Sequence, residues 1–152
     1  MNGSLAQNNM PLTGKDKTQA KQRIMSMMTP WLATVGFERI AGGRTGGRFD
    51  YVAEDGVRLV LSIDVPTFDT IFRFWCYWET ASGDRIAQGP HSLPYECPNT
   101  PGQKRYSFRF HRDNEGHERC AANMQEWIRD ELLPWFVSRP KVDWSNPYVI
   151  KG

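Results

Sequence analysis

The clearest pattern in the chain is the alternation of side chains from Thr70 to Glu79. β-branched and aromatic residues fill this segment, no Gly or Pro interrupts it, and turn-forming residues follow it, which is typical of a β-strand. Alternation divides the strand into two faces. One face is wholly apolar and predicts contact with a core. The other face carries charged residues and amphipathic aromatic residues, a mixture unusual for a face that only meets water: Arg73, Trp75, Tyr77 and Glu79.

Other segments continue this strand pattern on both sides. Residues 49–53 and 57–65 predict a hairpin, because Asp55-Gly56 between them is a common hairpin turn. In its second strand the odd-numbered residues from 57 to 65 are all apolar, and the opposite face carries Arg58, Val60, Ser62 and Asp64. A short strand is predicted over 85–88. A last strand is predicted over 104–111, with Arg109 and His111 on its polar face.

Two segments have the apolar spacing of amphipathic helices. The first begins near Thr13, where Thr13 and Asp16 resemble a capping box, and its apolar residues recur to Val35. Pro30 predicts a kink or a second helix, and Gly36-Phe37 predicts a left-handed cap. The second helix is predicted from about residue 114 to 139, with a proline at 134 near its end.

Strands that follow one another between two helices predict an α+β fold. We expect an antiparallel sheet of about four to five strands in a meander, with an N-terminal and a C-terminal helix packed on one face. Residues 13–140 are predicted to form one domain. Residues 1–12 are predicted to be a flexible tail, and residues 141–152 a tail docked on the surface. The Pro-rich segment 89–102 predicts an irregular loop.

The segment from Ile40 to Arg48 contains four glycines and two arginines. A glycine-rich loop that cradles phosphate lies between a strand and the start of a helix. This segment instead follows a helix and precedes a strand, and it matches neither G-x-G-x-x-G nor the P-loop pattern. We therefore interpret it as a flexible connection, with anion binding as the alternative.

Composition narrows the class of protein. The chain has 152 residues, enough for one domain with a single core, and its formal net charge is +2. That charge by itself does not indicate a nucleic-acid partner. No apolar run is long enough to span a membrane, and no signal peptide is visible. Three widely spaced cysteines do not form a disulfide framework, so we expect a cytoplasmic protein.

No set of residues with catalytic or metal-binding spacing stands out. His117 and Cys120 are close in sequence, but no second pair completes a zinc site, and Cys120 also belongs to the apolar stripe of its helix. A nucleophilic pair of Cys97 with His91 lacks an evident orienting group and oxyanion site. We therefore expect no metal, no cofactor and no catalytic residues, while leaving an enzyme open as an alternative.

The polar face of the sheet is the candidate binding site. Trp, Tyr and Arg dominate interface hot spots, because they bury a large area and keep a polar group. If the strands are neighbours, the following predicted partner-binding residues share one surface: Arg58, Asp64, Arg73, Trp75, Tyr77, Arg109 and His111. The open alternative is that the C-terminal tail or the 89–102 loop covers Trp75 and Tyr77 as a minor second core.

Several segments together resemble a known family. The chain resembles the bacterial DUF4304 family in three places. These are the end of the first helix at 31–37, the strands with Phe49-Asp50-Tyr51 and 59–63, and the end of the last helix at 132–136. The resemblance covers about residues 15 to 138. It implies a small bacterial cytoplasmic α+β domain, and the family has no assigned catalytic residues. Domains of this kind occur near genes of polymorphic toxins, where an immunity role is suspected.

We therefore predict a non-enzymatic protein-binding module of a bacterial cell, with an immunity-type inhibitor of a toxin as its specific form. The first alternative is a single-stranded nucleic-acid binder, since aromatic residues and arginines on an antiparallel sheet can stack bases. The second is an uncharacterised small-ligand-binding protein. The near-neutral net charge favours the protein partner over nucleic acid.

Overall fold

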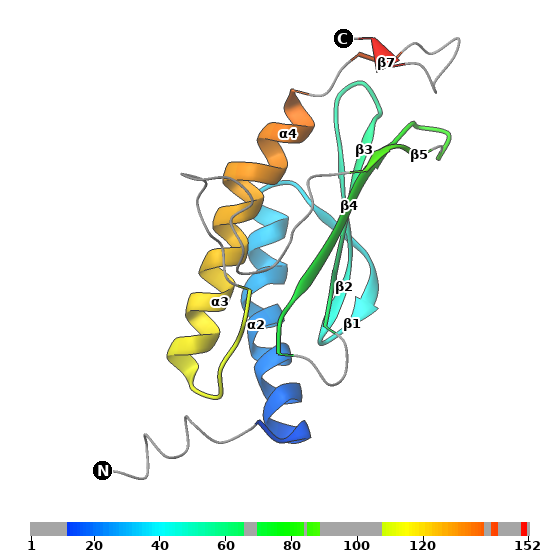
Figure 1. The fold of residues 1–152 in the computed structure, drawn as a ribbon. Coiled ribbons are helices and arrows are strands. Elements are labelled where there is room, and N and C mark those ends of the chain that lie inside the picture. The colour runs from blue at the N-terminus through cyan, green and yellow to red at the C-terminus, as the bar shows by residue number, and fades with distance from the viewer. Residues whose placement is uncertain are drawn as a thin grey trace.

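The computed structural model describes residues 12–65, 70–83, 85–88, 108–138, 141–142 and 150–151, and of the strands at 85–88, 141–142 and 150–151 it describes only the backbone. Two long helical segments bracket the strands (Figure 1). In chain order the elements are α2 (Gly14–Thr34), β1 (Glu38–Gly43), β2 (Gly46–Val52), β3 (Arg58–Asp64), β4 (Arg73–Glu79), β5 (Arg85–Gln88), α3 (Asn114–Trp127), the π-helical turn η1 (Ile128–Leu132), α4 (Leu133–Val137), β6 (Lys141–Val142) and β7 (Ile150–Lys151).

The first five strands form one antiparallel sheet in the order β1-β2-β3-β4-β5. Each strand therefore pairs with its neighbour in sequence, as in a meander. Figure 1 shows α2 and α3 side by side on one face of this sheet. The predicted α+β fold is confirmed, with five strands in the sheet.

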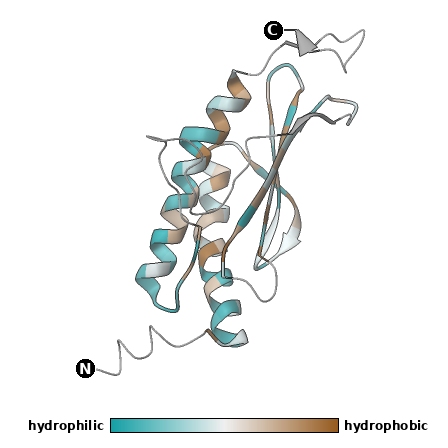
Figure 2. Cartoon of the chain, viewed as in Figure 1, coloured by the Kyte–Doolittle hydropathy of each residue, from teal (hydrophilic) through white to brown (hydrophobic). Residues whose placement is uncertain are grey.

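The core lies between the sheet and the helices. The fully buried side chains include Trp78 and Leu61 from the sheet, Ile24 and Met28 from α2, and Met124 from α3. Burying an apolar side chain of this size contributes about 1.5–3 kcal/mol. Figure 2 shows hydrophobic residues on the strands and at intervals along both helices, between hydrophilic ones. The two amphipathic stripes and the apolar strand face thus meet in one core.

Helix α2 begins and ends as its sequence predicts. The Asp16 backbone N–H donates to the Thr13 hydroxyl at 3.1 Å, and the Thr13 N–H donates to the Asp16 carboxylate at 3.0 Å, which completes a capping box. At the other end Gly36 has φ +104°, and the Phe37 N–H donates to the Leu32 carbonyl at 2.9 Å. These bonds form a Schellman cap, which needs glycine at the left-handed position.

Of the two outcomes predicted at Pro30, a kink or a second helix, the second helix does not occur, because α2 continues through Pro30 to Thr34. Pro30 lies on the exposed side of the helix, whereas Met28 and Leu32 on either side of it are buried in the core. Packing of the apolar stripe therefore keeps the helix continuous across the one hydrogen bond that the proline removes.

The glycine-rich segment is a β-hairpin, so its interpretation as a flexible connection was wrong. Strands β1 and β2 pair closely at their glycines, with Gly42 opposite Gly47 and Gly43 opposite Gly46. Gly42 has φ +127°, and a Cβ atom there would lie 2.4 Å from the Gly47 Cα. Glycine is needed at 42 and at 47, because the two backbones approach there too closely for a side chain. A bulge between Arg39 and Ala41 interrupts the register.

The C-terminal helical segment changes its winding before Pro134. Helix α3 begins at Asn114 with Asp113 as its N-cap, and η1 follows it as a π-helical turn. The Leu133 N–H donates to the Ile128 carbonyl, five residues earlier. A proline ring crowds the carbonyl four residues before it, and the wider turn accommodates that ring at the start of α4.

The described part of the predicted last strand, 108–111, is not a strand but joins the sheet through one bridge between Ile71 and Arg109. The Phe72 N–H donates to the Phe108 carbonyl at 3.0 Å. Residues 1–11, the 89–102 loop, 104–107 and most of the C-terminal tail lie outside the described residues. Within the tail, β6 and β7 pair with each other. Leu12, the last residue of the predicted N-terminal tail, packs against the core.

Candidate functional site

The sheet presents a second face, opposite to α2 and α3, which we call the outer face. Its side chains alternate with the core residues along β2, β3 and β4, so that Trp75 is on the outer face and Trp78, three residues later, is in the core. The register places the residues of the outer face in rows across the strands: Arg48, Ser62 and Trp75; Asp50, Val60 and Tyr77; Val52, Arg58 and Glu79; and Asp64 with Arg73.

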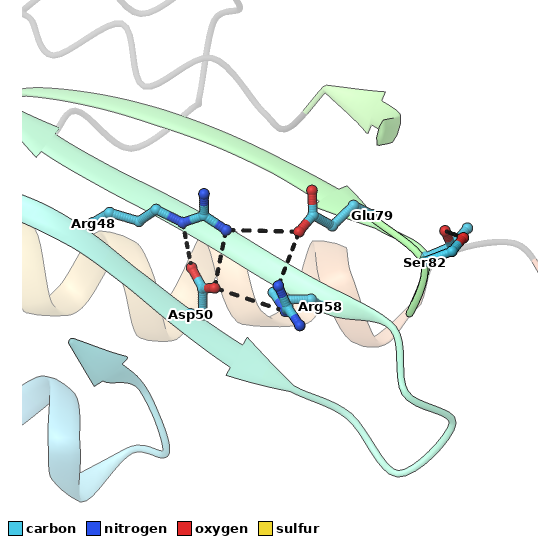
Figure 3. Close-up of polar contacts among 6 residues, drawn as sticks. Arg48, Asp50, Arg58, Glu79 and Ser82 are labelled. Carbon is cyan, nitrogen blue, oxygen red and sulfur yellow. Dashed lines mark hydrogen bonds and ion pairs between the residues drawn. The ribbon is translucent and has the colours of Figure 1, made fainter. Parts of the chain in front are cut away.

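Four charged residues of this face form a network, which we call the charge cluster: Arg48, Asp50, Arg58 and Glu79. Figure 3 shows their side chains pointing toward one another across three strands. Arg48 donates to both oxygens of Asp50, at 2.9 Å from Nε and 3.0 Å from Nη2. Arg58 Nη1 lies 3.3 Å from Glu79 Oε1, and the remaining contacts, Arg48–Glu79 and Arg58–Asp50, measure 3.6 and 3.7 Å.

The charge cluster is balanced and partly buried. The side chains of Asp50 and Glu79 are 5% and 10% exposed, whereas those of Arg48 and Arg58 are about one-third exposed. The hydrogen bond to Asp50 raises the pKa of Arg48, although burial opposes this. The cluster therefore links side chains of β2, β3 and β4 across the outer face.

The accessible part of the outer face lies beside the charge cluster. The Trp75 side chain is 58% exposed, an unusual position for a large indole ring. Arg73 and Asp64 are also exposed and stand opposite each other in the register. Arg109 is placed near them by its bridge to Ile71, and its Nη1 donates to the Thr70 hydroxyl at 3.1 Å.

The structure brings most of the predicted partner-binding residues to this face. Arg58 belongs to the charge cluster, and Tyr77 lies half-buried close enough to influence Arg48 electrostatically. His111 lies elsewhere, at the start of α3, where a Cβ atom on Gly116 would come within 2.8 Å of the His111 Cβ. His111 is not on the outer face because the chain leaves the sheet after the Ile71–Arg109 bridge and turns into α3.

Sequence reasoning missed the two residues that β2 contributes to the cluster, Arg48 and Asp50. The glycine-rich segment that ends at Arg48 predicts a flexible connection, which gives Arg48 no place on the sheet. Once β2 begins at Gly46, alternation puts Arg48 and Asp50 on the same face as Arg58. Extending the alternation of residues 49–53 back through Gly47 and Gly46 would have placed Arg48 on the outer face.

The two described cysteines, Cys76 and Cys120, are both buried. Burial raises the pKa of the Cys76 thiol, and it raises that of Cys120 to about 12, so neither forms a thiolate readily at neutral pH. The described residues contain no group of three His, Cys, Asp or Glu that could hold a metal ion. Among these residues no helix is both long and apolar enough to span a lipid bilayer.

Comparison of the chain with family models, curated proteins and solved structures finds no match. The resemblance to the DUF4304 family therefore stays a prediction. The outer face has to be interpreted from its own chemistry.

Proposed function

We propose that this protein is a non-enzymatic binding module that recognises a protein partner through the exposed part of its outer face. The observation that carries the proposal is the 58% exposed indole of Trp75 on β4, on the same face as Arg73. Tryptophan and arginine at the centre of an interface contribute the most binding energy, because they desolvate a large area while ordering few rotatable bonds.

The charge pattern of the outer face favours a protein over a nucleic acid. Each arginine of the charge cluster already faces two carboxylates at 3.7 Å or less, and Asp64 stands opposite Arg73. A nucleic-acid surface needs positive charge that is available to phosphates. A face that alternates both signs instead suits a partner with its own alternating charges, which fixes the orientation of binding.

The resemblance to DUF4304 domains supports a more specific form of the proposal, in which the protein is cytoplasmic and bacterial and inhibits a toxin by direct binding. No catalytic step is needed for such inhibition, since covering the toxin's site is sufficient. Co-expression tests this form: the wild-type chain should protect cells from the toxin domain it captures, whereas Trp75→Ala should not.

The binding proposal is tested in two steps with the full chain. First, the tagged protein is used to capture partners from the native host's lysate, both with and without nuclease treatment, and mass spectrometry identifies them. Second, calorimetry measures the affinity of the purified partner for wild type, Trp75→Ala and Arg73→Ala. We expect Trp75→Ala to weaken binding about thirtyfold, which corresponds to a hot spot of about 2 kcal/mol.

Val137→Ala is the matched control, because Val137 is 75% exposed and lies on α4, away from the sheet. It should bind as the wild type does. Unchanged affinity of both outer-face variants would show that the partner binds elsewhere. Capture of nuclease-sensitive material alone, with affinity for single strands that falls steeply as salt rises, would replace the protein partner by a nucleic acid.

A further inference from the structure

A cavity of about 260 Å³ lies between helix α2 and the end of the β1–β2 hairpin. Helix α2 contributes four residues at positions i, i+3, i+4 and i+7, so a single helix face lines it: Gln22, Met25, Ser26 and Thr29. The hairpin contributes Arg39, Gly43 and Arg44 from the opposite side. The cavity is separate from the outer face, because Arg39 pairs with the core residue Phe49 and so belongs to the helix side of the sheet.

The lining of this cavity is positively charged. Two of its residues are arginines and none is a carboxylate. Arg39 is held in place by hydrogen bonds from Nη2 to the carbonyls of Gly43 and Gly46, which leave its remaining N–H groups available. Arg44 is exposed in the hairpin turn and makes no ion pair with any described residue. This differs from the charge cluster, where each arginine has carboxylate partners.

The uncharged residues of the lining suit the same kind of ligand. The Gln22 amide and the Thr29 hydroxyl add hydrogen-bond donors from the helix. The Ser26 hydroxyl donates to the Arg23 carbonyl of its own helix, and Met25 is buried and provides an apolar wall. A ligand in this cavity would therefore meet donors and positive charge on two sides.

We infer that this cavity binds the phosphate group of a small molecule. Guanidinium groups pair with phosphate oxygens through parallel hydrogen bonds, and two arginines provide more donors than the two oxygens of a carboxylate can accept. The volume falls slightly below the roughly 300–1,000 Å³ of common ligand sites, which restricts the ligand to a compact one. This site is independent of the proposed protein-binding face.

The hairpin explains how the sequence builds this site. Glycines at 42 and 47 let the two strands approach closely, and the bulge after Arg39 changes the register. The turn then returns Arg44 toward α2. The inference therefore returns to the anion-binding alternative for the segment 40–48. The anion would be bound by side chains of a hairpin and a helix, and not by the backbone of a phosphate-binding loop.

Calorimetric titration of the full chain with inorganic phosphate and with phenyl phosphate tests the inference at constant ionic strength. Acetate serves as the carboxylate probe. We expect saturable phosphate binding that Arg44→Gln weakens at least tenfold, while Arg129→Gln, a matched exposed arginine on the C-terminal helical segment, leaves it unchanged. Tighter binding of phenyl phosphate would indicate a phosphorylated molecule, and tighter binding of inorganic phosphate would indicate the free ion.

A second pair of variants at one position guards against effects of folding. Ser26→Glu places a carboxylate in the cavity and should abolish phosphate binding, whereas Ser26→Gln, of similar size and uncharged, should retain it. Circular dichroism verifies that both variants are folded. The inference is overturned if phosphate binds no better than acetate, if it does not bind at all, or if Arg44→Gln and Ser26→Glu bind it as tightly as their controls.

Discussion

His117 shows how the environment of one residue can set a dependence on pH. Its side chain lies in the first turn of α3 and is 5% exposed, and neither ring nitrogen has a hydrogen-bond partner in the described part of the chain. Burial lowers the pKa of His117, and the positive charge of Arg23 on α2 acts in the same direction. The backbone carbonyl of His111 and the carboxylates of Asp113 and Glu118 oppose this shift.

The lowered pKa predicts that His117 destabilises the fold in mild acid. The unfolded chain takes up a proton near pH 6.5, whereas the folded chain does so only at lower pH, so stability falls as pH decreases from about 6.5 toward the folded pKa. His117→Leu removes this titration and two unpaired polar atoms. Urea denaturation at pH 7 and pH 5 should show a smaller loss of stability for this variant than for wild type. Equal losses in both proteins would contradict the prediction.

The β1–β2 hairpin shows the same dependence on environment at the scale of an element. Gly42 and Gly43 are neighbours in sequence, but they differ in the space around them and in backbone conformation. A Cβ atom on Gly42 would collide with the Gly47 backbone, whereas one on Gly43 meets nothing within 4 Å. Among the glycines of this hairpin, only Gly42 has a positive φ. Propensity alone would rank both glycines as equally poor in a strand.

Gly42→Ala should destabilise the protein by at least about 2 kcal/mol, because it adds both a clash and an unfavourable backbone conformation. Gly43→Ala is the matched control and should change the free energy of unfolding by less than about 0.5 kcal/mol. Thermal and urea denaturation of the two variants measure the difference. Similar stabilities would mean that the hairpin adjusts its backbone to admit a side chain at 42.

At the scale of the whole molecule, the helices cover one face of the sheet and leave two separate places for ligands. The outer face carries Trp75 and the charge cluster, and the cavity with Arg44 lies on the helix side at the hairpin. No residue lines both sites. The two proposed ligands therefore have no shared contact through which to compete.

We expect the two sites to act additively. Trp75→Ala should leave the affinity for inorganic phosphate within about twofold of wild type, and Arg44→Gln should leave the affinity for the protein partner equally unaffected. Calorimetry with each probe on both single variants and on the double variant measures the coupling. A coupling of more than about 1 kcal/mol would show that the sites communicate or that the partner also contacts the hairpin.

Much of the fold could be predicted from the sequence, because its signals are local. The capping box of Thr13 and Asp16, the cap at Gly36, the Asp55-Gly56 turn and the alternation in β3 and β4 each depend on residues close in the chain. Hydrophobic periodicity then determined which side of each element is buried. From these signals the α+β meander and the place of Trp75 on the face opposite the core follow without tertiary information, whereas its exposure does not.

Tertiary structure decided what depends on residues far apart in sequence. Pro30 remains inside α2 because the buried stripe on both sides of it packs against the sheet, and the glycine-rich segment becomes a hairpin because β3 pairs with β2. The charge cluster joins residues from three strands, and the cavity joins a helix to a turn. Periodicity assigns a residue to a face but not to its neighbours, which the register and the packing of the elements determine.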